Sequence, residues 1–212
     1  MIRYLATFAS LLLFAIGAAA QPPADPSAPP TVAKPLPRVA LDTSAGRIVV
    51  ELEAIKAPVT ANNFLRYVDA KRLDGTRFYR VAKVGERFGF VQFGISGAAA
   101  KMFPPIRHEP TSQTGLKHLE GTLSMARLKP GSATGDITIS VGDQPSFDAG
   151  SGSPPDNLGY AAFGRVVEGM DVILTVFNGA IDPNKLENRA FKGEVPVAPV
   201  VIRTARRVTA SR

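Results

Sequence analysis

Short apolar segments, separated by glycine, proline and polar residues, follow one another through the chain from residue 38 onward. In the stretch RVALDTSAGRIVVELEA, two apolar runs flank residues 44–46, and Ile48, Val50 and Leu52 alternate with their neighbours. A period of two is typical of strands with one buried face, so this stretch predicts a β-hairpin. Further strands are predicted over residues 78–83, 90–94, 122–127, 137–141, 163–167 and 200–206. A chain divided in this way is restricted to a mostly β fold.

Two other segments have helical periodicity. The apolar stripe of APVTANNFLRYVDAKR consists of Ala61, Phe64, Leu65 and Val68. The stripe of GMDVILTVFNG consists of Met170, Ile173, Leu174 and Phe177. Thr60 is placed to cap the first helix, and the second ends near Gly179. Because closure removes exposed strand edges, many short strands with two helices favour a closed antiparallel barrel capped by helices.

The first twenty residues have the features of a secretory signal peptide. Arg3 precedes an apolar stretch over residues 5–16, and alanines follow at 18–20. We predict cleavage before Gln21, which would make the mature protein periplasmic in a Gram-negative host. The alternative is an uncleaved membrane anchor, but a membrane span needs about 18 or more apolar residues, and this stretch is shorter.

Proline recurs through residues 21–37, QPPADPSAPPTVAKPLP, where large apolar residues are few. Such a segment buries too little surface to offset its ordering entropy, so it predicts a disordered linker rather than a proline-rich recognition motif. The pattern changes at residue 38. We expect one globular domain over residues 38–208 and a short C-terminal tail over 209–212.

The chain is basic, with 25 Lys and Arg residues against 18 Asp and Glu residues. We expect no nucleic-acid partner, because the predicted export argues against one and the charges are scattered. Only RTARRVTASR, near the C-terminus, is locally dense in arginine. After signal cleavage we expect no stable membrane insertion, only weak attraction to anionic membrane surfaces.

The sequence has no cysteine, which excludes disulfides and metal sites built on thiolates. Two histidines remain, His108 and His118, in the polar stretch PPIRHEPTSQTGLKHLEG. No partners converge on them at helix or strand spacing, so we expect both to be solvent-facing loop residues. Neither a metal nor a cofactor is predicted.

Five motifs occur in an order and rough spacing that resemble one family. They are APVTANNFLRYV, FYRV, GTLSMAR, SAT at residues 132–134, and GYAAFGRVVEGMDV. Over about residues 38–208 the chain resembles the cyclophilins, which are peptidyl-prolyl cis-trans isomerases, and most of all their exported bacterial branch. The resemblance implies an eight-stranded antiparallel barrel capped by two α-helices. It also implies isomerisation of X-Pro bonds in proline-containing polypeptides, without a cofactor.

By this resemblance Arg80, in FYRV, is the catalytic residue, and Gln92 holds substrate backbone beside it. The prolyl nitrogen regains a lone pair when its amide bond twists, so a hydrogen-bond donor aimed at it stabilises the transition state. Arginine suits this task because it stays protonated and holds its donors in a rigid fork. The alternative is that Arg80 is a surface strand residue paired with a carboxylate.

The resemblance also places residues around the substrate. These are Phe90, Ala126, Arg127, Asp136, Thr138, Phe147 and Tyr160. Phe90 and Phe147 would line an apolar pocket for the proline ring, and Ala126 and Arg127 would contact substrate backbone. Tyr160 stands where many members have histidine. Whether Phe88 or Phe90 is the pocket residue stays open, and Met125 is expected to fill the barrel instead.

The chain departs from the family pattern after SAT, where Ser-Gln-Phe-Phe is usual and GDIT stands here. Asp136 replaces a glutamine that donates and accepts, whereas an ionised aspartate only accepts. Thr138 replaces an aromatic wall of the pocket, which predicts weaker proline binding. Asp136 would be close enough to pair with Arg80, either orienting the guanidinium or occupying its donors.

Arg80 and Gln92 are also further apart in sequence than is usual, and the extra residues of AKVGERFG predict a longer loop hinged by Gly85 and Gly89.

Two functions are therefore carried forward. The first is an exported isomerase that accelerates X-Pro isomerisation during folding of exported proteins. The second is a proline-peptide binding module or chaperone on the same fold, with turnover weakened by Asp136 and Thr138. The default oligomeric state is a monomer.

Overall fold

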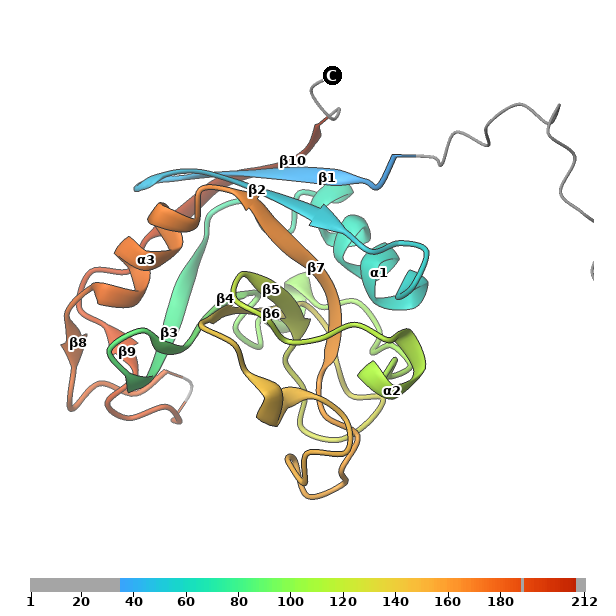
Figure 1. Ribbon diagram of the computed structural model, residues 1–212. Helices are drawn as coiled ribbons and strands as arrows, with labels where there is room; N and C mark the ends of the chain where they lie inside the picture. Colours follow the sequence, from blue (N-terminus) through green and yellow to red (C-terminus); the bar gives the residue numbers. More distant parts are fainter. Residues whose placement is uncertain (1–34, 188, 209–212) are drawn as a thin grey trace, which may run out of the picture. The chain divides into compact units, whose positions relative to one another are not determined.

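The computed structural model describes residues 35–187 and 189–208 (Figure 1). The predicted signal peptide, the C-terminal tail at 209–212 and all of the predicted linker except residues 35–37 lie outside the described residues. Within the described part, no helix has the length and apolar character needed to cross a membrane.

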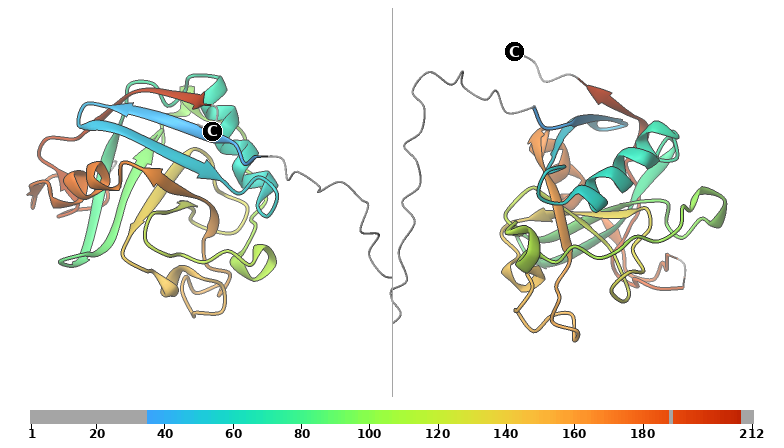
Figure 2. Two further views of the ribbon diagram at one scale, coloured as in Figure 1. Left: turned by 45° about the horizontal axis from the view of Figure 1, so that its top comes forward. Right: turned by 90° about the vertical axis from the view of Figure 1, so that its right-hand side faces the viewer.

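Eight strands close into an antiparallel barrel in the order β1-β10-β3-β4-β6-β5-β7-β2 (Figures 1 and 2). The strands are β1 (Arg38–Thr43), β2 (Gly46–Leu52), β3 (Thr76–Gly85), β4 (Phe88–Gly94), β5 (Thr122–Met125), β6 (Asp136–Val141), β7 (Ala161–Glu168) and β10 (Val201–Val208). A separate two-stranded sheet pairs β8 (Ile181–Asp182) with β9 (Val195–Pro196). The eight-stranded barrel is confirmed, and every predicted strand is present. Closure pairs the first strand with both the second and the last, so no barrel edge is left open.

Both predicted helices are present, as α1 (Pro58–Asp69) and α3 (Met170–Asn178), and Gly179 ends the second. They lie on opposite sides of the barrel (Figures 1 and 2). Short helical turns that the sequence did not predict are α2 (Thr111–Thr114), η1 (Ala99–Lys101) and η2 (Pro145–Phe147). On α3 the buried residues are Val172, Ile173, Val176 and Phe177, while Met170 and Leu174 are half-buried against the same core.

The predicted role of Thr60 as helix cap is wrong, because the helix already begins at Pro58. The buried carboxylate of Glu109 occupies this end instead. Its oxygens accept from the backbone N–H groups of Val59 at 3.1 Å and Thr60 at 2.8 Å, and from the Thr60 hydroxyl at 2.7 Å. A carboxylate is well suited to a helix N-terminus, where backbone donors are unpaired and the helix dipole is positive.

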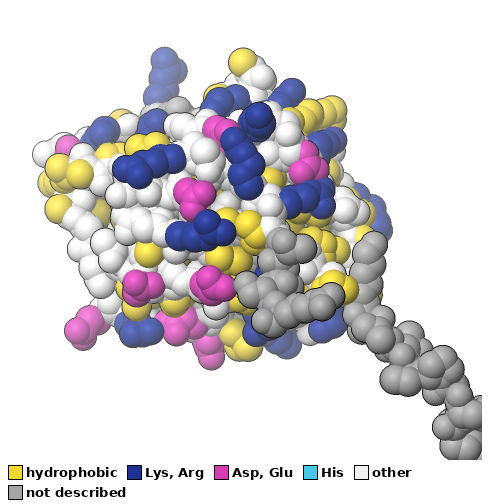
Figure 3. All heavy atoms as spheres, turned by 90° about the horizontal axis from the view of Figure 1, so that it is seen from above, with side chains coloured by type: hydrophobic (Ala, Val, Ile, Leu, Met, Phe, Trp, Pro, Cys, Tyr) yellow, Lys and Arg dark blue, Asp and Glu magenta, His cyan; other side chains and the backbone are white. Residues whose placement is uncertain are grey.

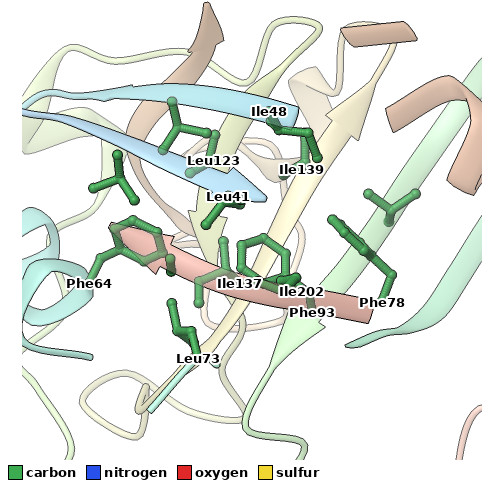
Figure 4. Close-up of a cluster of buried hydrophobic side chains, with 14 of the residues drawn as sticks. Leu41, Ile48, Phe64, Leu73, Phe78, Phe93, Leu123, Ile137, Ile139 and Ile202 are labelled. Atoms are coloured by element: carbon green, nitrogen blue, oxygen red, sulfur yellow. The ribbon is translucent and has the colours of Figure 1, made fainter. Parts of the chain in front are cut away.

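The barrel interior is filled by alternate residues of the strands, as the period of two predicts (Figure 4). Leu41, Ile48 and Ile202 meet Phe78 and Phe93 there, and the last two rings are 5.1 Å apart between centroids. Met125 is fully buried in this core, which confirms that it fills the barrel.

Basic and acidic side chains alternate over the face that carries β1, β2 and β10 (Figure 3). Arg206 pairs with Asp74 at 2.8 Å and Arg207 with Asp69 at 2.6 Å. Most of the arginine-dense C-terminal strand is therefore offset by carboxylates, and exposed pairs of this kind add little stability.

Candidate functional site

The strand pair β3–β4 brings Arg80 directly opposite Gln92. The predicted longer loop is wrong, because β3 continues to Gly85 and β4 already begins at Phe88. The additional residues lengthen the two strands instead. A glycine is required at 89, where φ is +153° and a Cβ atom would lie 2.0 Å from a carbonyl oxygen of the facing strand.

A pocket of about 490 Å³ opens beside strands β3, β4 and β6. The loops that follow β4, β5 and β6 and the segment between β8 and β9 complete its lining. Every residue predicted for the site lines it: Arg80, Phe90, Gln92, Ala126, Arg127, Asp136, Thr138, Phe147 and Tyr160. Phe90 lines the pocket and Phe88 does not, so the open choice between them is settled in favour of Phe90. The volume is in the range of sites that hold small ligands or short peptide segments.

Arg80 is held by two polar partners and remains partly exposed, at 22 % of its side chain. Its Nε donates to Glu194 Oε2 at 2.5 Å, and its Nη1 donates to Gln92 Oε1 at 3.1 Å. Nη2 has no hydrogen-bond partner among residues 35–187 and 189–208. The suggested pair with Asp136 is not formed. Arg80 is thus both paired with a carboxylate and part of the pocket, which combines the two readings that the sequence left open.

Aromatic rings surround this guanidinium. Its Cζ lies 4.0 Å from the ring centroid of Phe191 and 4.9 Å from that of Phe90, within the range of cation–π contacts. The Phe147 ring lies 5.7 Å from Phe90 and 5.1 Å from Tyr160, in edge-to-face arrangements. A cationic donor therefore stands beside an apolar niche of the kind that a proline ring needs.

Comparison with known proteins agrees with this geometry. The family model described as "Cyclophilin type peptidyl-prolyl cis-trans isomerase/CLD" matches residues 38–207. The chain belongs to the cyclophilin family. Its activity is peptidyl-prolyl cis-trans isomerisation.

Curated relatives of this cyclophilin include bacterial isomerases. It is 39 % identical to peptidyl-prolyl cis-trans isomerase cyp18 of Streptomyces antibioticus, over 79 % of this chain and 96 % of the relative. It is 38 % identical to peptidyl-prolyl cis-trans isomerase A of Dickeya dadantii, over 79 % of this chain and 83 % of the relative.

Solved structures of a Cryptosporidium parvum cyclophilin share the fold of this cyclophilin. One has a TM-score of 0.65 at 20 % identity and covers 83 % of this chain and 99 % of its own. A second structure of the same protein, determined in the presence of the dipeptide Ala-Pro, has a TM-score of 0.64 at 21 % identity and covers 81 % of this chain.

A buried polar chain runs behind Arg80 in this cyclophilin. Gln92 Nε2 donates to the Tyr79 hydroxyl at 2.6 Å, and that hydroxyl interacts with the Asp136 carboxylate. Asp136 Oδ1 also accepts from the backbone N–H of Ser96 at 2.7 Å. Burial raises the pKa of Asp136 above its usual value, and burial likewise raises the pKa of Tyr79. Asp136 thus anchors the back wall of the pocket through Tyr79 and the 96–97 turn.

Thr138 lies opposite Gln92 on β6 and is almost fully buried. Its Oγ1 is 2.8 Å from the Ser124 Oγ, so its hydroxyl is engaged with the neighbouring strand. The pocket at this point is lined by a small hydrogen-bonded side chain instead of a ring.

Arg127, for which contact with substrate backbone stays a prediction, lines the pocket and uses its side chain to hold a neighbouring loop. Its side chain is only 1 % exposed, and its guanidinium donates to both carboxylate oxygens of Asp156, at 2.7 and 2.8 Å, and to the Gly159 carbonyl. Hydrogen bonding from Arg127 lowers the pKa of Asp156 to about 2. Although it lines the pocket, its donors are engaged in holding the loop that carries Tyr160.

The expectation that both histidines face solvent is wrong. His118 is 1 % exposed, with Nδ1 2.8 Å from Asp148 Oδ1, and its ring packs on Phe147 with 5.7 Å between centroids. His108 is half-buried, with Nε2 3.2 Å from the Leu158 carbonyl. Burial lowers the pKa of both rings. In the described part of the chain, no three His, Asp or Glu side chains are grouped as a metal site.

Sequence reasoning missed two residues of the segment between β8 and β9: Phe191, which lines the pocket, and Glu194, which binds Arg80. Glu194 is 114 residues from Arg80, and none of the recognised motifs extends to it. Tyr79 was missed as well, although its place in FYRV next to Arg80 was a signal that could have found it.

Proposed function

We propose that this cyclophilin isomerises X-Pro bonds through Arg80, whose guanidinium donates to the prolyl nitrogen as the amide twists. The planar amide is separated from its isomer by about 18–20 kcal/mol, because rotation removes its resonance. The twisted state carries a lone pair on nitrogen that neither planar isomer presents, so a fixed cation beside it lowers the barrier selectively. The observation that carries the proposal is the Nη2 atom, without a partner among the described residues, at a pocket with aromatic walls.

The other pocket residues have distinct proposed roles. Phe90 and Phe147 would enclose the proline ring, and Tyr160 would extend this wall. Gln92, held between Arg80 and Tyr79, and Ala126, on the facing loop, would contact substrate backbone. The substrate class is a proline-containing polypeptide, a proposal supported by the solved relative whose structure was determined in the presence of the dipeptide Ala-Pro.

The place of action is proposed to be the periplasm of a Gram-negative host, on exported proteins that are folding. The support is the Arg3, apolar and small-residue pattern of residues 1–20, with Gln21 as the first mature residue. The mature chain would act as a monomer, without membrane insertion or nucleic acid. Expression of the full chain in such a host, followed by fractionation and N-terminal sequencing, tests this: an intact Met1 in the membrane fraction would contradict it.

A second candidate function is peptide binding with little turnover, as a chaperone or binding module. Thr138 favours it, since a threonine bonded to Ser124 offers the proline ring less apolar surface than an aromatic wall would. Binding without acceleration in the assay below would select this function.

A protease-coupled assay on a short X-Pro peptide tests the role of Arg80. We expect Arg80→Ala to lower kcat/KM by about 100-fold or more, as removal of one transition-state donor typically does. Arg80→Lys keeps the charge but not the fork, so little activity should return. Arg87→Ala is the matched control, because Arg87 pairs with Glu120 at the turn of the same hairpin, outside the pocket. Equal rates for Arg80→Ala and wild type would refute the proposal.

A further inference from the structure

The segment between β8 and β9 contributes two side chains that contact the guanidinium of Arg80. Glu194 binds its Nε, and the Phe191 ring covers one side at 4.0 Å. With Phe90 at 4.9 Å and Gln92 on Nη1, the guanidinium is held by two aromatic rings and two polar acceptors. Only Nη2 is left without a hydrogen-bond partner among the described residues.

The segment is itself fixed to the barrel. The Glu194 carbonyl accepts from the backbone N–H of Val81, next to Arg80, at 2.7 Å. Earlier in the segment, Glu187 accepts from Arg77 Nη2 with both carboxylate oxygens at 3.0 Å and from the Ser96 hydroxyl at 2.5 Å. The contact with Arg80 therefore comes from an element tied to β3 at several points, and its geometry is defined by those ties.

We propose that Glu194 is a positioning residue for catalysis: it fixes the Arg80 guanidinium so that Nη2 points into the pocket, with Phe191 preventing rotation of its plane. This deepens the proposed function and rests on it. An arginine side chain has several rotatable bonds, and an unanchored one would have to lose that freedom in each catalytic event. An anchor made before substrate binds removes this cost from the transition state.

The negative charge of Glu194 leads to an expected order of effects among its variants. A charge-assisted bond to Nε is stronger than a bond to a neutral acceptor, so Glu194→Gln should hold the guanidinium less firmly than glutamate and more firmly than alanine. The backbone bond from Val81 does not depend on the side chain at 194, so these variants keep the segment in place.

The test compares wild type, Glu194→Gln, Glu194→Ala, Phe191→Leu and Arg80→Ala by NMR exchange spectroscopy on an X-Pro peptide, which yields kcat and the peptide Kd separately. We expect Glu194→Ala to lower kcat by about 10- to 100-fold with Kd changed less than about threefold. Glu194→Gln should recover part of the loss, and Phe191→Leu should lower kcat by a few-fold. Glu120→Ala, which removes another arginine-paired carboxylate outside the pocket, is the control and should match wild type.

The outcomes separate this inference from the proposal on Arg80. If Arg80→Ala is inactive while Glu194→Ala keeps the wild-type kcat, only the positioning role is overturned. The same holds if the kcat of Glu194→Ala exceeds that of wild type, which would mean that the carboxylate weakens the electrostatic effect of the Arg80 cation. If Glu194→Ala weakens Kd as much as kcat, Glu194 binds substrate and does not position Arg80. If Arg80→Ala is as fast as wild type, the catalytic role of Arg80 fails and this inference fails with it. Thermal unfolding of each variant, unchanged within a few degrees, would attribute the losses to the site.

Discussion

The side chains of Arg80 and Gln92 meet across the β3–β4 pair, where the two residues are register partners and Nη1 donates to Oε1 at 3.1 Å. Gln92 is 5 % exposed and also donates to Tyr79, so its orientation is fixed from behind. It couples the catalytic candidate to the buried wall of the pocket.

The first prediction concerns this coupling. Gln92→Ala removes one of the two polar anchors of Arg80 and leaves the buried Tyr79 hydroxyl with one partner fewer. We expect kcat/KM to fall about tenfold, the loss that corresponds to one hydrogen bond of about 1–1.5 kcal/mol. Gln113→Ala, an exposed glutamine on α2, is the control. An unchanged kcat/KM for Gln92→Ala would show that the glutamine is dispensable.

The second prediction concerns the small side chain at 138. Thr138→Phe adds apolar surface to the pocket wall, so an X-Pro peptide should bind about three- to tenfold more tightly, at about 25 cal/mol per Å² of added burial. Thr138→Val is the matched control, because it removes the hydroxyl bonded to Ser124 without adding a ring. Titration calorimetry gives both Kd values. Equal Kd values for the Phe and Val variants would mean that this wall does not contact proline. The same Kd measurement for Thr138→Phe combined with Asp136→Gln shows whether the residues at 136 and 138 affect binding together.

The third prediction follows from the raised pKa of Asp136, which burial causes. When the pKa of a carboxyl group is higher in the folded than in the unfolded protein, the group costs no stability at low pH, where it is protonated in both states. The unfolding free energy then falls as pH rises through the folded pKa, because the buried group must ionise. Asp136→Asn should therefore raise the unfolding free energy at pH 7, and this gain should shrink as pH falls toward the usual aspartate value of 3.8. Urea unfolding at pH 7 and pH 4 measures it. A gain that grows with acidity would have the wrong sign.

The fourth prediction concerns His118, whose pKa burial holds below the usual 6.5 despite the opposing effect of Asp148. The contribution of a neutral buried histidine to the unfolding free energy is fully present above pH 6.5. It is lost as pH falls through the lowered folded pKa, because the unfolded protein takes up the proton more readily. The chain has two histidines, so His108→Gln leaves one imidazole NMR signal to titrate. Its midpoint should lie below that of a free histidine. Because the ring packs on Phe147, the Phe147 signals should shift over the same pH range, and a midpoint at 6.5 or above would contradict the prediction.

The fifth prediction concerns the carboxylate at the start of α1. Glu109→Ala leaves the backbone donors of Val59 and Thr60 unpaired in a buried place, which should lower the unfolding free energy by about 1–3 kcal/mol. Glu109→Gln keeps an acceptor oxygen and should lose less. Because this end of the helix does not line the pocket, kcat/KM should stay near the wild-type value in both variants. Equal stability of wild type and Glu109→Ala would remove the capping role.

Much of the site was predictable because its elements are encoded locally. The alternation of Ile48, Val50 and Leu52 reflects which face of a strand is buried, and that is a property of neighbouring residues. The motifs around Arg80 and Gln92 likewise identified the residues that line the pocket, since the two strands pair through a turn of two residues. The extra residues in this hairpin were expected to form a loop, because residues that extend both strands leave the same sequence signature as a longer connection.

The contacts that the sequence left undetermined all join residues far apart in the chain. Glu109 reaches α1 from 49 residues away, Asp148 reaches His118 from 30, and Glu194 reaches Arg80 from 114. Composition and periodicity describe how a residue relates to its neighbours in the chain. Partners that are distant in the chain depend instead on where the closed barrel places each loop. The sequence by itself determined the barrel, its two longer helices and nine of the residues that line the pocket. Only the tertiary structure decided which carboxylate anchors Arg80, because that choice depends on long-range packing of a segment with no periodic signal of its own.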